Sequence, residues 1–313
     1  MKFFKIPTIL LIWFIILNLG CKEKITTEPE NEVVKEIVEK EKPVMRTLHK
    51  QFKDYWYAGK AEITSFKLQQ ARYGELREGH AVLIYVTEDF LPEKQVKADR
   101  PKKDNLKILK LNSTKNFLTG IYPYSIMTST FHPVFTKEHA VKVSNSVQEW
   151  CGQVYMQLNN RDGYEINAHS YFEGEADQFL KLEKEHLENE LWTQIRIAPD
   201  ELPKGNIKLI PSMEFLRLQH KEIKAYEAVT SLENKGELSH YIITYPELKR
   251  TVTIMFQTDF PHGIEGWTDI YTSGYGSGAK TLTSTAIKLK TLKTDYWTKN
   301  KNTDAYLRNN LGL

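Results

Sequence analysis

Cysteine is scarce in this chain, which contains only Cys21 and Cys151 among 313 residues. Metal sites built from Cys-x-x-Cys pairs are therefore excluded. If Cys21 is modified, Cys151 has no partner for an internal disulfide. The fold must then be stabilised by its own core, which is feasible because chains of this length bury most of their surface.

Excess charge is also small. The formal net charge is +3, and two of the lysines, Lys2 and Lys5, lie in the first 20 residues, which contain no acidic residue. Without that segment the charge falls from +3 to +1. Because proteins that bind nucleic acid usually present a clearly basic face, we do not expect nucleic acid as a partner.

Several familiar catalytic motifs are missing. The sequence has no Gly-x-Ser-x-Gly, no His-Glu-x-x-His and no phosphate-binding loop. These motifs position a nucleophilic serine, a zinc ion and a nucleoside triphosphate, respectively. The sequence therefore gives no motif-based reason to expect any of these three kinds of enzyme.

Long hydrophobic runs are absent except at the N-terminus, where residues 6–19 are mostly apolar. The uninterrupted part, residues 9–17, is too short for a membrane-spanning helix, which needs about 20 residues. Lysines precede the run, and Gly20 and Cys21 follow it, in the order typical of a cleaved bacterial lipoprotein signal. We expect a signal peptide over residues 1–20 and lipidation of Cys21; an uncleaved anchor is the alternative.

The predicted location follows from this signal. A lipidated Cys21 would hold the protein at a membrane of the cell envelope, which we expect to be the outer membrane, on its periplasmic face or at the surface. Residues 21–50 are rich in Glu and Lys and predict a disordered tether. The Lys22-Glu23-Lys24 cluster is either part of that tether or a surface-export signal.

The rest of the chain, residues 51–313, reads as a single β-rich domain. Branched and aromatic residues alternate with polar ones, and turn residues recur at short intervals. We expect an α+β, β-dominated fold with one large antiparallel curved sheet or half-barrel. It could comprise two halves, residues 51–173 and 205–295, joined by a packing helix at about 174–196 whose apolar residues follow helical spacing. Residues 213–219 are expected to form one of the strands.

One hairpin can be assigned a register. Pairing Asn159 with Gly163 aligns Met156 with Ile166 and places apolar residues on one face. The other face would gather hydrogen-bonding and reactive side chains, namely Cys151, Gln153, Tyr155, Asn167, His169 and Tyr171. This polar face is the candidate site. It is either a ligand cleft, a nucleophilic Cys151/His169 pair or an ordinary solvated surface.

Other candidate residues have simpler interpretations. His186 lies four residues before Glu190 on the predicted helix, which suggests a salt-linked, solvated helix face. We therefore expect no metal and no cofactor. Clustered aromatics, including Tyr55, Trp56 and Tyr57, predict either core packing or the wall of an apolar or sugar-binding cleft.

Five segments resemble a family of uncharacterised bacterial lipoproteins, some of which are labelled septum formation inhibitor Maf. The similarity is carried by residues 55–65, 86–90, 120–129, 148–152 and 170–177. Maf proteins themselves are cytoplasmic α/β nucleotide pyrophosphatases with an N-terminal Ser-rich, Arg-containing motif. This chain lacks that motif, so the resemblance implies a lipoprotein rather than a pyrophosphatase.

The sequence thus predicts a cell-envelope lipoprotein that binds a lipid, a glycan or a protein partner in the concavity of its sheet. Two alternatives remain. One is an envelope hydrolase that uses Cys151 and His169, and the other is a structural or assembly lipoprotein without a small ligand.

Overall fold

The computed structural model describes residues 43–313, which form one compact unit. The predicted signal peptide, Cys21 and the tether up to residue 42 lie outside the described residues. None of the helices in residues 43–313 is long and apolar enough to cross a membrane. The fold is β-dominated, as predicted, with a large, open, curved antiparallel sheet and few helices.

The described residues contain sixteen strands. The first nine are β1 (Ala61–Arg72), β2 (Glu75–Leu91), β3 (Val96–Lys97), β4 (Leu106–Thr119), β5 (Tyr122–Pro133), β6 (Lys142–Glu149), β7 (Gly152–Asn160), β8 (Tyr164–Ser170) and β9 (Gln178–Leu182). The others are β10 (His186–Leu187), β11 (Gly205–Ile210), β12 (Tyr226–Lys235), β13 (Leu238–Tyr245), β14 (Arg250–Gln257), β15 (Ile264–Ser273) and β16 (Lys280–Thr294). The α-helices are α1 (Lys50–Trp56), α2 (Glu188–Ile197), α3 (Met213–Leu218) and α4 (Tyr306–Asn310).

A single sheet joins both halves of the chain. β1 to β9 form one antiparallel limb and β11 to β16 form the other, and β1 pairs with β16 where the limbs meet. β9 and β10 are the two ends of the sheet order. Only three residues separate them in sequence, so the link from Leu182 to His186 spans at most about 14 Å. The sheet therefore curls until its ends approach each other.

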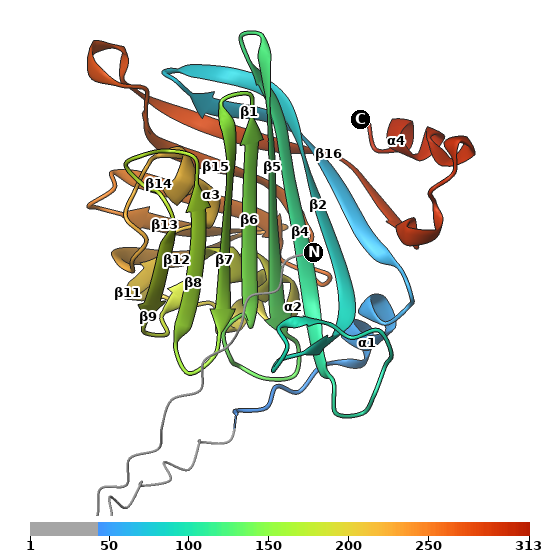
Figure 1. Cartoon of the computed structure of the whole chain (residues 1–313). Helices are drawn as coiled ribbons and strands as arrows, with labels where there is room; N and C mark the ends of the chain where they lie inside the picture. The colour runs from blue at the N-terminus through green and yellow to red at the C-terminus, as the bar shows by residue number, and fades with distance from the viewer. Residues whose placement is uncertain (1–42) are drawn as a thin grey trace, which may run out of the picture. The chain divides into compact units, whose positions relative to one another are not determined.

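Helices α2 and α3 fill the interior of this curl. Figure 1 shows them between the limb of β4 to β8 and the limb of β11 to β15. Alternate residues of each strand point to this inner face, as in β14, where Val252, Ile254 and Phe256 are buried. The main hydrophobic core lies here and leaves little of the concavity empty.

Charged side chains attach α2 to the sheet. Arg196 makes two hydrogen bonds to Glu62 of β1, at 2.6 and 2.7 Å, and both side chains are almost completely buried. The Arg196 guanidinium also lies over the Tyr85 ring, 4.6 Å from its centroid. Tyr55 of α1 donates a hydrogen bond to the same carboxylate. One ion pair thus connects α2, β1 and α1.

Ordered contacts begin before the expected domain boundary at residue 51. The Arg46 side chain is 5% exposed, pairs with Glu201 at 2.9 Å and donates hydrogen bonds to the carbonyl groups of Pro133, Val134 and Thr136. Residues 43–49 are therefore part of the folded unit rather than of a free tether.

The predicted helix at 174–196 is largely wrong. Only α2, at its end, is helical; residues 178–182 form β9, which pairs with β8. Ala176 has a φ of 49°, which interrupts any continuous right-handed helix. The predicted strand at 213–219 is instead α3, whose start is capped by Ser212, the side chain of which accepts a hydrogen bond from the Phe215 N–H.

The β7–β8 hairpin exists with a register shifted by two residues. Met156 pairs with Ala168 rather than with Ile166, and Asn160 pairs with Tyr164 around a three-residue turn. A shift of two leaves each side chain within β7 and β8 on its predicted face, because side chains alternate with a period of two. The apolar pattern therefore predicted the faces correctly but could not distinguish between these two registers.

Candidate functional site

The enclosed space inside the sheet is small. A cavity of about 60 Å³ lies between α3 and the inner face, with Trp192, Trp267 and Phe215 among its lining residues. That volume holds only a few water molecules. The concavity where we expected a ligand is thus occupied by α2, α3 and the core.

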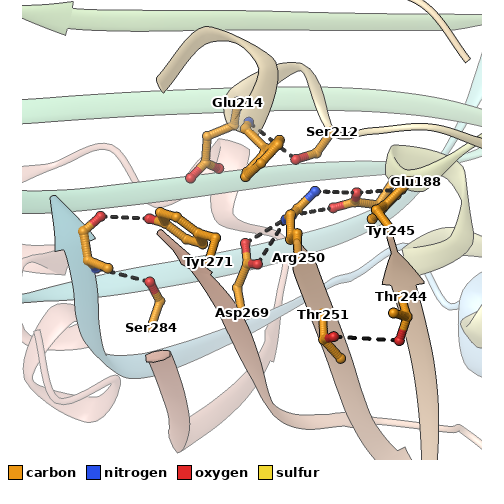
Figure 2. Close-up of polar contacts among 12 residues, drawn as sticks. Glu188, Ser212, Glu214, Thr244, Tyr245, Arg250, Thr251, Asp269, Tyr271 and Ser284 are labelled. Atoms are coloured by element: carbon orange, nitrogen blue, oxygen red, sulfur yellow. Dashed lines mark hydrogen bonds and ion pairs between the residues drawn. The ribbon is translucent and has the colours of Figure 1, made fainter. Parts of the chain in front are cut away.

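A buried ion-pair network lies beside this cavity. In Figure 2, Arg250 of β14 stands between Glu188 of α2 and Asp269 of β15. Its guanidinium makes hydrogen bonds of 2.7 and 2.9 Å to Glu188 and of 2.8 and 2.9 Å to Asp269. Tyr245 donates a further hydrogen bond of 2.8 Å to Glu188. These contacts fix α2 against the second limb.

Burial and neighbouring charges shift the pKa values of Asp269 and Arg250 in this network. Burial raises the pKa of Asp269, and the nearby negative charge of Glu188 adds to that rise, whereas Arg250 opposes it. Burial works against the charged form of Arg250, but Asp269 and Glu188 together raise the pKa of its guanidinium well above the ordinary value. Arg250 is therefore permanently charged, and it compensates the buried carboxyl group of Glu188 and the partly buried one of Asp269.

A larger depression lies outside the core, where β2 and β3 meet α1 and the C-terminal segment. We call it the β2–β3 groove. Its volume is about 360 Å³, and it is lined by Tyr57, Val86, Thr87, Glu88, Asp89, Lys97, Ala98, Asp99, Pro101 and Trp297. This volume lies within the range typical of small-molecule sites.

Two exposed aromatic rings belong to the groove. Tyr57 follows α1 and is 42% exposed, and Trp297 lies in a 3₁₀ turn after β16 and is 49% exposed. Burial raises the pKa of Tyr57 to about 12, with a contribution from the negative charge of Asp89. The hydroxyl of Tyr57 thus stays protonated and can donate a hydrogen bond to a ligand.

Carboxylates form the polar part of the groove. Asp89 contacts Lys107 at 2.5 Å and Asn105 at 3.1 Å, and these hydrogen bonds outweigh burial and lower its pKa. One oxygen of Glu88, Oε1, contacts Lys110 at 2.7 Å. The other, Oε2, is buried and has no hydrogen-bond partner among the described residues. An unpaired buried acceptor is costly, so a small rotation of the Glu88 side chain that exposes this oxygen to the groove would let it accept a hydrogen bond from a ligand.

The predicted polar face lies on the outer side of the sheet, away from α2 and α3. Five of its six residues, all except Asn167, are exposed: Cys151, Gln153, Tyr155, His169 and Tyr171. The structure brings Tyr155 and His169 together as a cross-strand pair, whereas Cys151 sits in the turn between β6 and β7.

Cys151 and His169 have different neighbours. A hydrogen bond to the Glu149 carboxylate raises the pKa of the Cys151 thiol, which opposes formation of a nucleophilic thiolate. His169 lies 3.3 Å from Asp177 and packs edge-on against Phe179. This environment gives no support to a thiolate–imidazole pair.

Sequence reasoning missed most of the groove. Tyr57 belongs to the aromatic cluster that is predicted to pack in the core or to line a cleft. It lies in the groove, whereas its neighbour Trp56 is buried in the core. Glu88 and Trp297 carried no local signal, because they are more than 200 residues apart. The Arg250 network did carry a local sequence signal. Arg250 lies two residues before Val252 and four before Ile254, so its side chain points to the same inner face, which predicts a buried charge with a partner.

A second cluster, of His139, His186 and Glu190, has the composition of a metal site.

Comparison of the chain with protein-family models, with curated proteins and with solved structures gave no match. The resemblance to a lipoprotein family therefore stays a prediction, and the functional argument depends on the geometry above.

Proposed function

We propose that this protein is a non-enzymatic, lipid-anchored protein of the cell envelope, held at the outer membrane by Cys21, which binds a glycan in the β2–β3 groove. The observation that carries the proposal is the combination of two exposed aromatic rings with an unpaired buried carboxylate oxygen, Glu88 Oε2.

Saccharides match both parts of this arrangement. The C–H face of a sugar ring packs on an aromatic ring, while its hydroxyl groups donate hydrogen bonds to carboxylates. Tyr57 and Trp297 supply the rings, and Glu88, Asp89 and Asp99 supply acceptors. Lys97, whose ammonium lies 3.7 Å from Glu88, supplies a donor.

A glycan fits this groove better than a lipid does. A lipid chain needs an apolar tunnel, but the interior cavity of about 60 Å³ cannot hold one without displacement of α3. The groove is open and bordered by charged side chains, which would leave an acyl chain in contact with water and with unpaired polar groups.

A glycan array tests the proposal. The full-length protein in detergent should bind a restricted set of saccharides, and Trp297→Ala should weaken that binding by about 2–10-fold, the effect of one aromatic contact. Glu88→Gln should also weaken it, because the amide replaces one acceptor oxygen with a donor.

Trp150→Ala is the matched control, since Trp150 is an exposed tryptophan, 68% accessible, in the turn between β6 and β7. It should bind the same saccharides as the unaltered protein. Equal losses in Trp150→Ala and Trp297→Ala, or no saccharide bound by the unaltered protein, would refute the proposal.

A second candidate, an assembly lipoprotein, is favoured by one observation. Trp150, Tyr171 and Phe179 are 68–72% exposed around β7 to β9, and β9 is an edge strand. Exposed aromatic residues next to an unpaired edge are typical of protein interaction surfaces. Cross-linking in intact cells, followed by comparison with Phe179→Asp, would test whether a protein partner covers this surface.

A further inference from the structure

Three potential metal ligands meet at the beginning of α2. His139 comes from the loop between β5 and β6, His186 from β10 and Glu190 from the first turn of α2. One ligand atom from each lies within 4.8 Å of the others. The two imidazole rings are in edge-to-face contact, with their centroids 5.2 Å apart.

Both histidines face the same carboxylate oxygen. Nδ1 of His139 lies 2.7 Å from Glu190 Oε1, and Nδ1 of His186 lies 3.9 Å from it. That oxygen also accepts the Leu187 N–H at 3.1 Å. The second oxygen, Oε2, accepts the Ala140 N–H at 2.7 Å. These backbone bonds fix the orientation of Glu190, as partners outside the coordination sphere do in metal sites.

A third histidine, His132, is buried without a hydrogen-bond partner within residues 43–313, on the strand that α2 packs against. His132 is 2% exposed, on the inner face of β5, and neither ring nitrogen has a hydrogen-bond partner among the described residues. Helix α2, which carries Glu190, packs against β5, which carries His132. An unsatisfied buried imidazole costs free energy, and a metal-bound water is the kind of partner it lacks.

We propose that His139, His186 and Glu190 bind a divalent transition-metal ion of the Zn²⁺ class. Two imidazoles and one carboxylate form a ligand set that Zn²⁺ accepts, with water as the fourth ligand. The side chains of His139 and His186 are 29% and 37% exposed, so an ion can reach the site from solvent.

Binding requires only a modest contraction. Bonds of about 2.0–2.1 Å place tetrahedral ligands about 3.3 Å apart, so side chains now up to 4.8 Å apart would close by about 1.5 Å. Two of the three ligands are partly exposed histidines, which can move without disturbing the core. The bound ion would connect the β5–β6 loop to β10 and α2, near the point where the two ends of the sheet approach each other.

The test uses full-length protein in detergent, carrying an affinity tag without histidine and treated with EDTA. Isothermal titration with ZnCl₂ should show one bound ion per chain. His186→Ala should weaken that binding at least about 10-fold, since loss of a ligand should cost no less than loss of an outer-shell partner. His169→Ala is the matched control, because His169 also faces a carboxylate, at 3.3 Å, but lies on the outer face.

Co²⁺ gives a readout that does not depend on any variant. Intense visible absorption by the Co²⁺-loaded protein would support four-coordinate binding, and a weak six-coordinate spectrum would overturn the proposal. Absence of stoichiometric Zn²⁺ binding, equal affinity of His186→Ala and unaltered protein, or a loss confined to His169→Ala would also overturn it. Should His186→Ala lose its native circular dichroism, His139→Ala replaces it under the same criteria.

Discussion

Replacement of Arg250 by methionine should strongly destabilise the fold. Arg250 and Glu188 are 2% and 3% exposed, and the guanidinium makes four hydrogen bonds to Glu188 and Asp269. Methionine keeps much of the side-chain volume but leaves Glu188 buried without its cation. Removal of one partner of a buried ion pair costs about 3–5 kcal/mol.

Thermal unfolding followed by circular dichroism measures this cost. For a domain of this size each kcal/mol lowers the melting temperature by about 2–4 °C, so Arg250→Met should melt about 6–20 °C lower. Adding Glu188→Leu and Asp269→Asn should restore most of the loss, because no unpaired charge then remains in the core.

The matched control is Arg161→Met, which removes a half-exposed arginine that lies 3.2 Å from Glu165. Exposed pairs of this kind contribute at most about 1 kcal/mol. Equal shifts for Arg250→Met and Arg161→Met would refute the reasoning, because the buried network would then contribute no more than a surface ion pair.

Three further predictions concern other parts of the chain. Gly79→Ala should lower the free energy of unfolding in urea by about 1–3 kcal/mol, because the new Cβ would lie 2.1 Å from a carbonyl oxygen of the neighbouring strand. Gly174→Ala is the control and should leave stability unchanged, because no atom lies within 4 Å of the new Cβ. Burial opposes ionisation of Glu62, but the Arg196 guanidinium beside it lowers the pKa of its carboxyl group. The stability that this carboxylate contributes is therefore present above about pH 4.5 and is lost as the pH falls through the lowered pKa. Glu62→Gln should be less stable at neutral pH, and its melting temperature should fall less steeply with decreasing pH in a melting series. Cys151 is exposed and should react with a maleimide in the native protein, and Glu149→Gln should speed the reaction by removing the contact that raises the thiol pKa.

Much of the fold was predictable because strand patterns are local. The alternation in residues 238–245 and 249–257 marks β13 and β14 to within a residue or so, since all inward positions except Ser239 and Arg250 are apolar or aromatic. The helix at 174–196 failed because its apolar spacing also suits a short edge strand followed by a turn. What makes residues 178–182 a strand is pairing with β8, a tertiary contact that spacing cannot reveal.

The candidate groove was much less predictable. Glu88 and Trp297 come from opposite ends of the folded chain and meet only because β1 pairs with β16 and the C-terminal segment returns beside β2. By contrast, the polar face of the β7–β8 hairpin was visible in the sequence because its residues are neighbours. Alternation assigned those side chains to one face but gave no information on whether that face would be hollow or flat.

The central claim, glycan binding in the β2–β3 groove, is tested most directly by a crystal structure of the protein with the saccharide that binds most strongly on an array. The account predicts a sugar ring stacked on Tyr57 or Trp297, with a hydroxyl group within hydrogen-bond distance of Glu88 Oε2. A saccharide bound at any other surface, or a groove that stays empty at saturating saccharide, would contradict it.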